Sequence, residues 1–459
     1  MIPDDLKKVF KDKKVAILGF GREGTSTYHL IRSLFPEKHI AVFDSNDKIK
    51  EIPFLKDDLN CSIFSGRDYL NFLNDYDLVI KSPGISFKEL SKIKLQGRIT
   101  SQTDIFLSCF SSQVIGITGT KGKSTTSTLL LNVLKNAGYD VVFVGNIGIP
   151  PFDEVNHINE NTFIVYEISS HQLQSVRNSP HISVLLNIFQ EHLDHYNSYD
   201  DYQKAKMNIL KFQKPDDIFI YNADNDVVLS KMKTLKVNSI CLPFSNERDL
   251  KPGCYNDGKI LKICLKNDIC FLYDVNFKRN LLGHHNLMNI AIVIMVSKII
   301  GVEDEVIFDT IATFIGLPHR MEYVGCFNNK HFYNDSIATI PEAAIEAIKT
   351  IKDVDTLVTG GFDRGIDYMA YANFLSHSSI RNIVFIGDAG KRMFDLMAGI
   401  NNTKRCFLYD NFDDGVKKAI ELTKEASVCL MSPAAASYGM FKNFEERGMR
   451  FLEIIKQNS

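Results

Sequence analysis

The sequence predicts an α/β fold built from three consecutive segments, and two glycine-rich loops with repeated strand–helix alternation are the main evidence. The apolar run Val15–Leu18 leads into a G-x-G-x-x-G motif at Gly19, Gly21 and Gly24. The second loop, GITGTKGKST, spans residues 116–125 between an apolar run and a helix-forming stretch. Such strand–loop–helix units build parallel sheets with helices on their faces.

Composition limits the class of protein. A chain of 459 residues favours two to three domains, and a net charge of −2 argues against a nucleic-acid partner. The start is charged, and the sequence lacks an apolar run of 18 residues, so we expect a cytoplasmic protein without a membrane span. Nine cysteines lie scattered, with Cys264 and Cys270 closest, which predicts reduced thiols and no disulfide framework. We expect a monomer.

The first segment, residues 1–110, shows Rossmann-like βαβ alternation. The apolar run HIAVFD ends at Asp44, twenty residues after the last glycine of the first loop, and DLVIKSPGIS ends in the turn Ser82–Gly84. Two readings remain open. The loop binds a dinucleotide or another diphosphate, with Asp44 on a ribose hydroxyl, or its glycines serve only close strand–helix packing.

The second segment, residues 111–316, is expected to form the ATP-binding domain. Strand candidates QVIGIT, VVFVGN, FIVYEIS, ISVLLNI and IFIYNAD each end at polar or small residues. Residues 228–282 alternate in polarity, which predicts antiparallel hairpins, and NLMNIAIVIMVSKII predicts a helix. The third segment, residues 317–459, alternates again and predicts a second Rossmann-like α/β domain that ends in the helix FKNFEERGMRFLEIIKQ.

The loop at 116–125 predicts a phosphate site. Glycines before a helix N-terminus present several backbone N–H groups to an anion, and the helix dipole favours negative charge there. The spacing is shorter than in the common G-x-x-x-x-G-K-[ST] loop, because Ile117 stands where its first glycine belongs. Lys123 is suited to the outer phosphates and Ser124 to Mg²⁺. The expected ATP-binding loop comprises Gly119, Thr120, Lys121, Gly122, Lys123, Ser124 and Thr125.

A carboxylate and a histidine follow two further strands of the same segment. Glu167 ends FIVYE, and His192 lies in IFQEHLDH. Both strand ends are expected at the edge of the sheet that carries the phosphate loop, where a carboxylate suits Mg²⁺ and a histidine would also admit Mn²⁺. Zinc is the weaker alternative, since there is no H-E-x-x-H motif, and for His195 we favour a solvated loop residue.

The chain resembles the Mur ligases over essentially its whole length. GTKGKS, YEISSHQ, NIFQEHLDH, KAKMNIL, GHHNLMN, LPHRME and YNDSIAT occur in the order seen in that family. The members that add D-glutamate are the most similar. The resemblance implies that ATP phosphorylates the carboxylate of UDP-MurNAc-L-Ala, and that the amine of D-glutamate attacks the acyl phosphate. It also implies two Mg²⁺ ions and a carbamylated lysine at Lys206, which by itself reads as an exposed helix lysine.

The resemblance also implies site residues. Those for the UDP-linked substrate are Gly19, Gly21, Arg22, Gly24, Asp44, Ser82, Pro83, Gly84, Asn146 and Gln172. Those for the nucleotide outside the loop are Asn286 and Asn289 at adenine, with Arg320 and Asp335 near ribose and phosphates. Those for D-glutamate are Thr339, Arg364, Ser437 and Phe444. The implied catalytic residues are Lys123, Glu167, His192 and Lys206, and the implied metal ligands are Ser124, Glu167, His192 and Lys206.

Three positions depart from the family pattern, and two other functions remain open. Glu191 stands where aspartate commonly precedes the histidine, Ile337 where some members have lysine, and Tyr438 where a smaller apolar residue is usual. A related ligase for another amino acid or acceptor, of Mur or folylpolyglutamate-synthase type, is the alternative enzyme. A nucleotide-binding scaffold without catalysis is the alternative outside enzymes.

Overall fold

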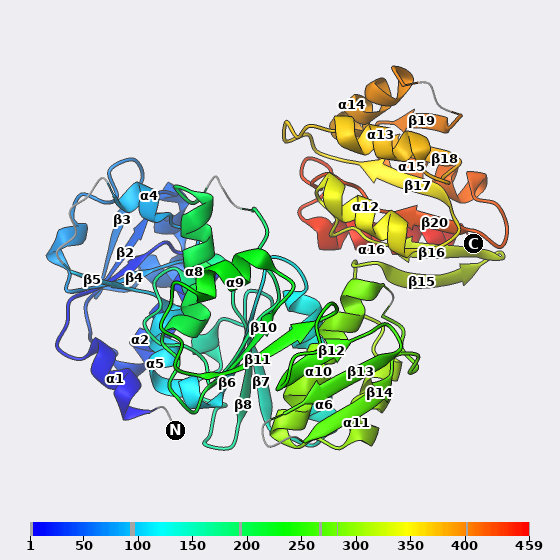
Figure 1. The fold of residues 1–459 in the computed structure, drawn as a ribbon. Helices are drawn as coiled ribbons and strands as arrows, with labels where there is room; N and C mark the ends of the chain where they lie inside the picture. The colour runs from blue at the N-terminus through cyan, green and yellow to red at the C-terminus, as the bar shows by residue number, and fades with distance from the viewer. Residues whose placement is uncertain are drawn as a thin grey trace. The chain divides into compact units, whose positions relative to one another are not determined.

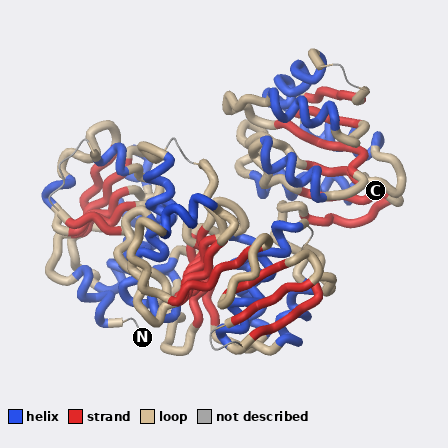
Figure 2. Tube along the Cα trace, viewed as in Figure 1, coloured by secondary structure: helices blue, strands red, loops and turns tan. Residues whose placement is uncertain are grey.

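The computed structural model describes residues 3–91, 97–191, 195–265, 269–281, 283–400 and 403–458. The chain forms two compact units, residues 1–278 with 285–312, and residues 279–284 with 313–459. Strands of the described ranges form three sheets, two in the first unit and one in the second (Figures 1 and 2). Within the described ranges, no helix is long and apolar enough to cross a membrane.

The first sheet is parallel, with strand order β3-β2-β1-β4-β5. Its strands are β1 (Val15–Leu18), β2 (Ile40–Asp44), β3 (Cys61–Ser65), β4 (Leu78–Lys81) and β5 (Arg98–Thr100). The associated helices are α1 (Asp4–Phe10), α2 (Arg22–Leu34), α3 (Pro53–Lys56), α4 (Phe87–Leu90) and α5 (Gln102–Phe110), with 3₁₀ turns Asp47–Glu51, Leu73–Asp75 and Ser111–Gln113. The predicted βαβ alternation is therefore present, and the strand β1 is buried along its whole length.

The second sheet has the order β14-β13-β12-β11-β10-β9-β6-β8-β7. Its strands are β6 (Val114–Thr118), β7 (Val141–Gly145), β8 (Phe163–Glu167), β9 (Ile182–Leu185), β10 (Ile218–Asn222), β11 (Ile240–Ser245), β12 (Gly253–Asn256), β13 (Ile260–Cys264) and β14 (Cys270–Asp274). The helices are α6 (Lys123–Asn136), α7 (Ser170–Leu173), α8 (Tyr199–Lys211), α9 (Asp226–Met232), α10 (His284–Ile300) and α11 (Asp304–Thr313), with the 3₁₀ turn Pro151–Asp153. The parallel strands β7, β8, β6 and β9 end at one edge, which carries the phosphate loop.

Two expectations for residues 228–282 were wrong in part. Among the described residues of this segment, the antiparallel pairs are β12–β13 and β13–β14, whereas β11 pairs in parallel with β10. Cys264 and Cys270 form a disulfide, although the sequence predicts reduced thiols. They lie directly opposite each other in the β13–β14 register, and facing positions of a hairpin bring two Cβ atoms within reach of a bridge.

The third sheet has the order β15-β16-β20-β17-β18-β19 and is parallel except for the β15–β16 pair. Its strands are β15 (Glu322–Phe327), β16 (Lys330–Asn334), β17 (Val354–Gly360), β18 (Asn382–Ile386), β19 (Arg405–Tyr409) and β20 (Val428–Met431). Its helices are α12 (Pro341–Thr350), α13 (Met369–His377), α14 (Gly387–Ala398), α15 (Phe412–Leu422) and α16 (Phe444–Gln457). Alternate strand residues face two cores, one under α12–α14 and one under α15 and α16.

Hydrogen bonds join the first sheet's elements to those of the second. The Tyr166 hydroxyl of β8 donates to Thr103 Oγ1 of α5 at 2.8 Å, and both groups are buried. The backbone N–H of Arg177 donates to Asp104 Oδ1 at 2.7 Å. Because buried polar groups need partners, these bonds fix α5 against the second sheet.

Candidate active site

The phosphate loop lies between the buried strand β6 and helix α6, as the sequence predicts. Gly122 is the N-cap of α6 and has a positive φ of 87°, which glycine adopts without strain. A Cβ at Gly122 would lie 2.7 Å from Asn289 Oδ1, and one at Gly119 would lie 2.8 Å from Leu186 Cβ. Space therefore requires glycine at position 119, and the backbone conformation requires it at position 122.

Asn187, which the sequence analysis did not single out, holds the loop from the end of β9. Its Oδ1 accepts from the Lys121 backbone N–H at 2.8 Å, and its Nδ2 donates to the Lys121 carbonyl at 3.1 Å. Thr120 Oγ1 is within 2.8 Å of the Tyr202 hydroxyl. The only sequence signal for Asn187 was its position as a polar residue directly after an apolar run. These contacts order the loop before any ligand arrives, which lowers the entropic cost of binding.

Two lysines meet below the loop. Lys123 Nζ donates to the carbonyls of Gly119 at 2.8 Å and Thr120 at 3.1 Å. Lys206 Nζ, from α8, donates to the same Gly119 carbonyl at 2.8 Å. Lys206 is buried, so the reading of an exposed helix lysine was wrong. Burial, together with the positive charge of Lys123, lowers the pKa of Lys206 well below its ordinary value.

Glu167, a predicted metal ligand, is completely buried at the end of β8. Its Oε1 accepts from Asn146 Nδ2 at 2.8 Å, and Ser127 Oγ lies 3.4 Å from Oε2. His192 lies outside the described residues. Within the described part, no three His, Cys, Asp or Glu side chains gather as a metal-binding group. The donors that are described, the Glu167 carboxylate and the Ser124 hydroxyl, are oxygen ligands of the kind Mg²⁺ prefers.

The residues expected at adenine adjoin the phosphate loop. Asn289 Nδ2 donates to Asn286 Oδ1 at 3.2 Å, and both side chains are buried near the start of α10. The proximity of Asn289 to Gly122 brings α10 to the N-terminus of α6. Segments separated by more than 160 residues thus meet at one edge of the sheet.

The N-terminal glycine loop packs against the turn after β4. Gly19 has a positive φ of 87°, and the Ser82 hydroxyl donates to its carbonyl at 2.7 Å. A Cβ at Gly24 would lie 2.1 Å from the Gly19 carbonyl oxygen, whereas one at Gly21 or Gly84 would meet no atom within 4 Å. The loop therefore combines a close helix–strand contact with an open side.

Other residues expected at the UDP-linked substrate are occupied by protein contacts. Asp44 accepts from the backbone N–H of Phe20 at 2.6 Å and of Asn46 at 2.8 Å. The guanidinium of Arg22 donates to the Gly148 carbonyl. Gln172 Nε2 donates to Glu23 Oε1 at 2.7 Å, a partner that the sequence analysis missed. Pro83 lies between Ser82 and Gly84 in the turn after β4.

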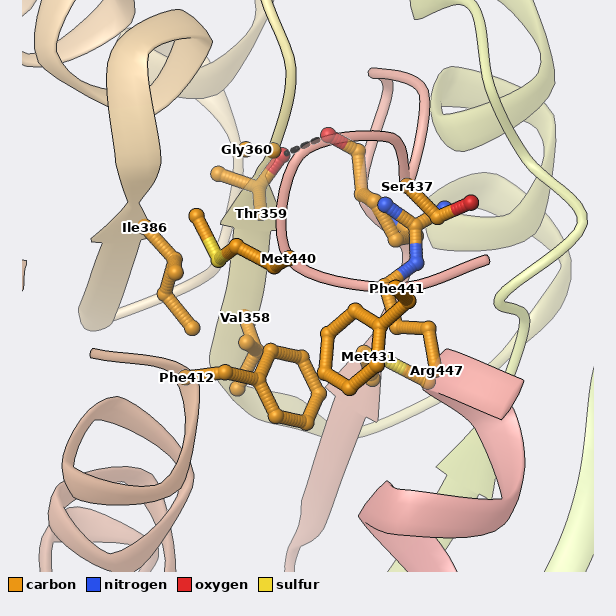
Figure 3. Close-up of a pocket in the computed structure, with 12 residues that line it drawn as sticks. Val358, Thr359, Gly360, Ile386, Phe412, Met431, Ser437, Met440, Phe441 and Arg447 are labelled. Carbon is orange, nitrogen blue, oxygen red and sulfur yellow. Dashed lines mark hydrogen bonds between the residues drawn. The ribbon is translucent and has the colours of Figure 1, made fainter. Parts of the chain in front are cut away.

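In the second unit, three of the residues expected at D-glutamate, Thr339, Arg364 and Ser437, lie on loops at the carboxyl ends of the strands, and Phe444 is the first residue of α16. Arg364 donates to the Thr339 carbonyl at 2.6 Å, which joins the loops after β17 and β16. The Phe444 carbonyl accepts from the Ser336 hydroxyl at 2.8 Å. Ser437 lines a pocket between the ends of β17, β18 and β20 (Figure 3).

Arg447, also missed by the sequence analysis, lines the same pocket from α16 (Figure 3). Its buried guanidinium donates to Ser336 Oγ at 3.0 Å, the Ser336 carbonyl at 2.8 Å and the Ala435 carbonyl at 3.1 Å. Burial lowers the pKa of Arg447 to about 9. Arg447 thus ties α16 to the loops after β16 and β20.

Asp335 follows β16 in the second unit and is buried. Its Oδ2 accepts from the Ser432 hydroxyl at 2.7 Å, and its Oδ1 from the Met321 backbone N–H at 3.1 Å. Burial raises the pKa of Asp335 to about 7. Arg320, the other residue expected near ribose and phosphates, immediately precedes Met321 in the same unit.

Comparison with known proteins agrees with this architecture. Residues 117–297 match the Mur ligase middle domain family. A UDP-N-acetylmuramoylalanine–D-glutamate ligase from Acetivibrio thermocellus is 31% identical, with 98% of each chain covered. The UDP-N-acetylmuramate–alanine ligase MurC of Thermotoga maritima has a TM-score of 0.59 at 18% identity, covering 97% of this chain and 100% of the other. The MurF ligase of Thermotoga maritima in complex with ADP has a TM-score of 0.58 at 17% identity, covering 92% and 95%.

Fold and loop together define an α/β protein with three sheets and a glycine-rich loop of the phosphate-binding type. The chain belongs to the family of the UDP-N-acetylmuramoylalanine–D-glutamate ligases, within the Mur ligases. The expected fold class and ligase class are thereby confirmed. The boundaries at residues 110 and 316, and the role of each site residue, stay predictions.

Proposed function

We propose that the protein joins D-glutamate to UDP-MurNAc-L-Ala with consumption of ATP, in the synthesis of peptidoglycan precursors. The proposal depends mainly on one observation: Lys123 and Lys206 both donate hydrogen bonds to the Gly119 carbonyl of the phosphate loop. The buried Glu167 lies at the end of β8, on the same edge of the sheet. The relative named for D-glutamate ligation, similar over nearly the whole chain, supports the choice of substrates.

The reaction proceeds in two steps. A carboxylate oxygen of the L-alanyl group attacks the γ-phosphorus of ATP, the bond to the leaving oxygen of ADP breaks, and an acyl phosphate forms. The amine of D-glutamate then attacks the acyl carbon, phosphate leaves, and the nitrogen loses a proton. Phosphorylation is needed because a carboxylate is a poor electrophile. The protein's contribution is therefore positioning and neutralisation of charge around phosphate.

Residues of the first unit supply that neutralisation. Backbone N–H groups from Gly119 to Thr125 cradle the phosphates at the start of α6, and Lys123 turns its ammonium to the transferred group. Two Mg²⁺ ions, with Mn²⁺ as a substitute, would be held by Ser124, Glu167, His192 and Lys206, and would polarise the phosphoryl oxygens. Asn286 and Asn289 of the first unit hold adenine. The expected roles of Arg320 and Asp335 near ribose and phosphates stay predictions.

Lys206 serves as a ligand only after conversion to a carbamate. Its amine adds to the carbon of CO₂, loses a proton, and becomes an anionic oxygen donor. That addition requires the neutral amine, which burial and the charge of Lys123 favour. The buried position and lowered pKa of Lys206 are the observations that support this proposal.

The two remaining substrates bind at separate loops. The UDP end is held by the Gly19–Gly24 loop with Arg22, Asp44 and the Ser82–Gly84 turn, and the muramoyl part by Asn146 and Gln172. In the second unit, D-glutamate is held by Thr339, Arg364, Ser437 and Phe444. Arginine at position 364 allows a bidentate interaction with a carboxylate. We propose that the enzyme acts in the cytoplasm as a monomer.

A substrate panel tests the proposal. Purified protein with ATP, Mg²⁺ and UDP-MurNAc-L-Ala is given D-glutamate, L-glutamate, L-alanine or meso-diaminopimelate, and phosphate release and product mass are measured. We expect release and the matching product with D-glutamate. Release with another amino acid alone, or with a folate acceptor, would favour the related amide ligases. Absence of release with every pair would favour a nucleotide-binding scaffold.

A further inference from the structure

Glu23 occupies an unusual position for a glycine loop that is to bind a diphosphate. It is the second residue of α2, immediately after the turn Gly19–Arg22. A helix N-terminus favours carboxylates and phosphates alike, so an ionised Glu23 would occupy part of the field that the loop offers to an anion. The role of Glu23 therefore depends on its contacts and its charge.

One carboxyl oxygen of Glu23 orients Gln172. Oε1 of Glu23 accepts from Gln172 Nε2 at 2.7 Å, while Gln172 Oε1 accepts from the Ser169 backbone N–H at 2.8 Å. The backbone N–H of Gln172 donates to the Ser169 hydroxyl at 3.2 Å, which completes a capping box. The Gln172 amide is thus held at both ends, once from α7 itself and once from the N-terminal loop.

The other carboxyl oxygen lies away from solvent without a hydrogen bond. Oε2 of Glu23 is buried and has no hydrogen-bond partner among the residues that the structure describes. The charged and titratable groups that influence this carboxyl are Arg22 on its own helix, Lys81 at the end of β4, and Tyr166 on β8, whose hydroxyl donates to Thr103. Desolvation raises the pKa of Glu23 to about 7, and the Gln172 hydrogen bond and the two cations only partly oppose it.

The neutral form of Glu23 is compatible both with the hydrogen bond to Gln172 and with an anion bound at the start of α2. A protonated carboxyl still accepts from Gln172 through Oε1, and it carries no charge that opposes an incoming anion. We propose that Glu23 is a positioning residue of the nucleotide-sugar site and orients Gln172 in its neutral, protonated form. Binding of the diphosphate is then coupled to uptake of a proton at Glu23. This proposal rests on the function proposed above.

The coupling has a defined sign. A diphosphate beside α2 disfavours the carboxylate, so the pKa of Glu23 rises further on binding. Affinity for the UDP-linked substrate should then fall as pH rises above about 7, by up to about tenfold per pH unit. The KM for ATP and the kcat at saturation should not show this pH dependence, because Glu23 contacts neither the phosphoryl group nor the carboxylate that reacts with it.

Glu23→Gln is the decisive variant, because it keeps an acceptor oxygen for Gln172 but cannot ionise. We expect its KM for UDP-MurNAc-L-Ala to be nearly independent of pH between about pH 6 and pH 9, with kcat close to wild type. Glu23→Ala should raise that KM by about tenfold at every pH, because Gln172 loses a partly buried hydrogen bond. The matched control is Glu51→Gln, which makes the same chemical change at an exposed residue in the 3₁₀ turn after β2. This variant should keep the wild-type dependence of KM on pH.

Proton uptake is measured without turnover by titrating UDP-MurNAc-L-Ala into the protein in two buffers of different ionisation enthalpy. We expect fractional proton uptake near neutral pH for wild type and its loss in Glu23→Gln. A wild type that binds and turns over the substrate, together with a Glu23→Gln variant that keeps the wild-type pH dependence and proton uptake, would overturn the role of Glu23. A wild type without turnover would instead overturn the proposed function.

Discussion

The Nζ atoms of Lys123 and Lys206 donate to the same acceptor, the carbonyl oxygen of Gly119, each at 2.8 Å. Two ammonium groups that share one carbonyl repel each other, and burial removes the solvent that would screen them. Lys206 is the buried member and has the lowered pKa. The half-buried Lys123 therefore lies beside a buried lysine whose pKa is lowered.

The first prediction concerns Lys206. Lys206→Ala should lose most activity, because the site loses an anionic ligand for Mg²⁺, and short carboxylates such as acetate or propionate should restore part of it. Turnover is measured with and without the added acid, and Lys204→Ala, at an exposed lysine on the same helix, is the control. Full activity of Lys206→Ala without carboxylate dependence would contradict the carbamate.

The second prediction concerns Lys123. Lys123→Ala should lower kcat by roughly 100-fold or more, because the charge that develops on the transferred phosphoryl group is left uncompensated. Steady-state kinetics and a melting curve are recorded together. Lys121→Ala is the comparison, since Lys121 lies in the same loop but is exposed and pairs with Glu191 at 3.1 Å. Near-wild-type turnover of Lys123→Ala with normal melting would rule out this role.

The third prediction concerns the metal. Glu167→Ala and His192→Ala should each raise the Mg²⁺ concentration needed for half-maximal activity, because each removes a proposed ligand. Asn146→Ala should have a smaller effect on that concentration, since Asn146 bonds to Glu167 Oε1 without being proposed as a ligand. Unchanged Mg²⁺ titrations for both Glu167→Ala and His192→Ala would show that neither residue holds the ion.

The fourth prediction concerns choice of the amino acid. Arg364→Ala should raise the KM for D-glutamate about tenfold or more, with the KM for ATP near wild type, because one carboxylate loses its cationic partner. The exposed Arg405, on β19, provides the control variant Arg405→Ala. An Arg364→Ala enzyme with weakened ATP binding would assign Arg364 to the nucleotide site.

The fifth prediction concerns pH and the stability of the second unit. The pKa of Asp335 is raised by burial to about 7, so the folded state holds its proton more firmly than the unfolded state. The stabilising contribution of that proton is fully present below about pH 4 and is lost as pH rises through about 7. Asp335→Asn should remove this component, which melting temperatures of both proteins across the same pH range would reveal. Identical pH dependence of the two would contradict it.

Local sequence patterns were sufficient for the secondary elements that carry the loops. The run Val15–Leu18 and the run before Gly119 became buried strands, and both glycine loops open helices, because glycine spacing and apolar runs act within a few residues. The predicted antiparallel region within residues 228–282 was too long, because alternation alone does not distinguish a strand with parallel neighbours, such as β11, from a hairpin strand.

The burial of charged side chains could not be predicted from these local sequence patterns. Lys206 lies on the face of α8 that packs under the phosphate loop, and Arg447 lies on the face of α16 that packs beneath two loops. A helix pattern assigns lysine and arginine to solvent unless partners distant in sequence supply acceptors, here the carbonyls of Gly119 and Ala435. Those partners become known only when the chain is folded.

The sequence by itself determined the α/β class, the two glycine loops and the chemical types at the candidate site, since these depend on short-range spacing. Only the tertiary structure decided which residues are in contact. These pairs are Lys206 with Gly119, Glu23 with Gln172, Asn187 with Lys121, and Cys264 with Cys270. The physical reason is that a pKa or a hydrogen bond depends on desolvation and on atoms within a few ångströms. Which atoms those are is set by the packing of strands and helices far apart along the chain.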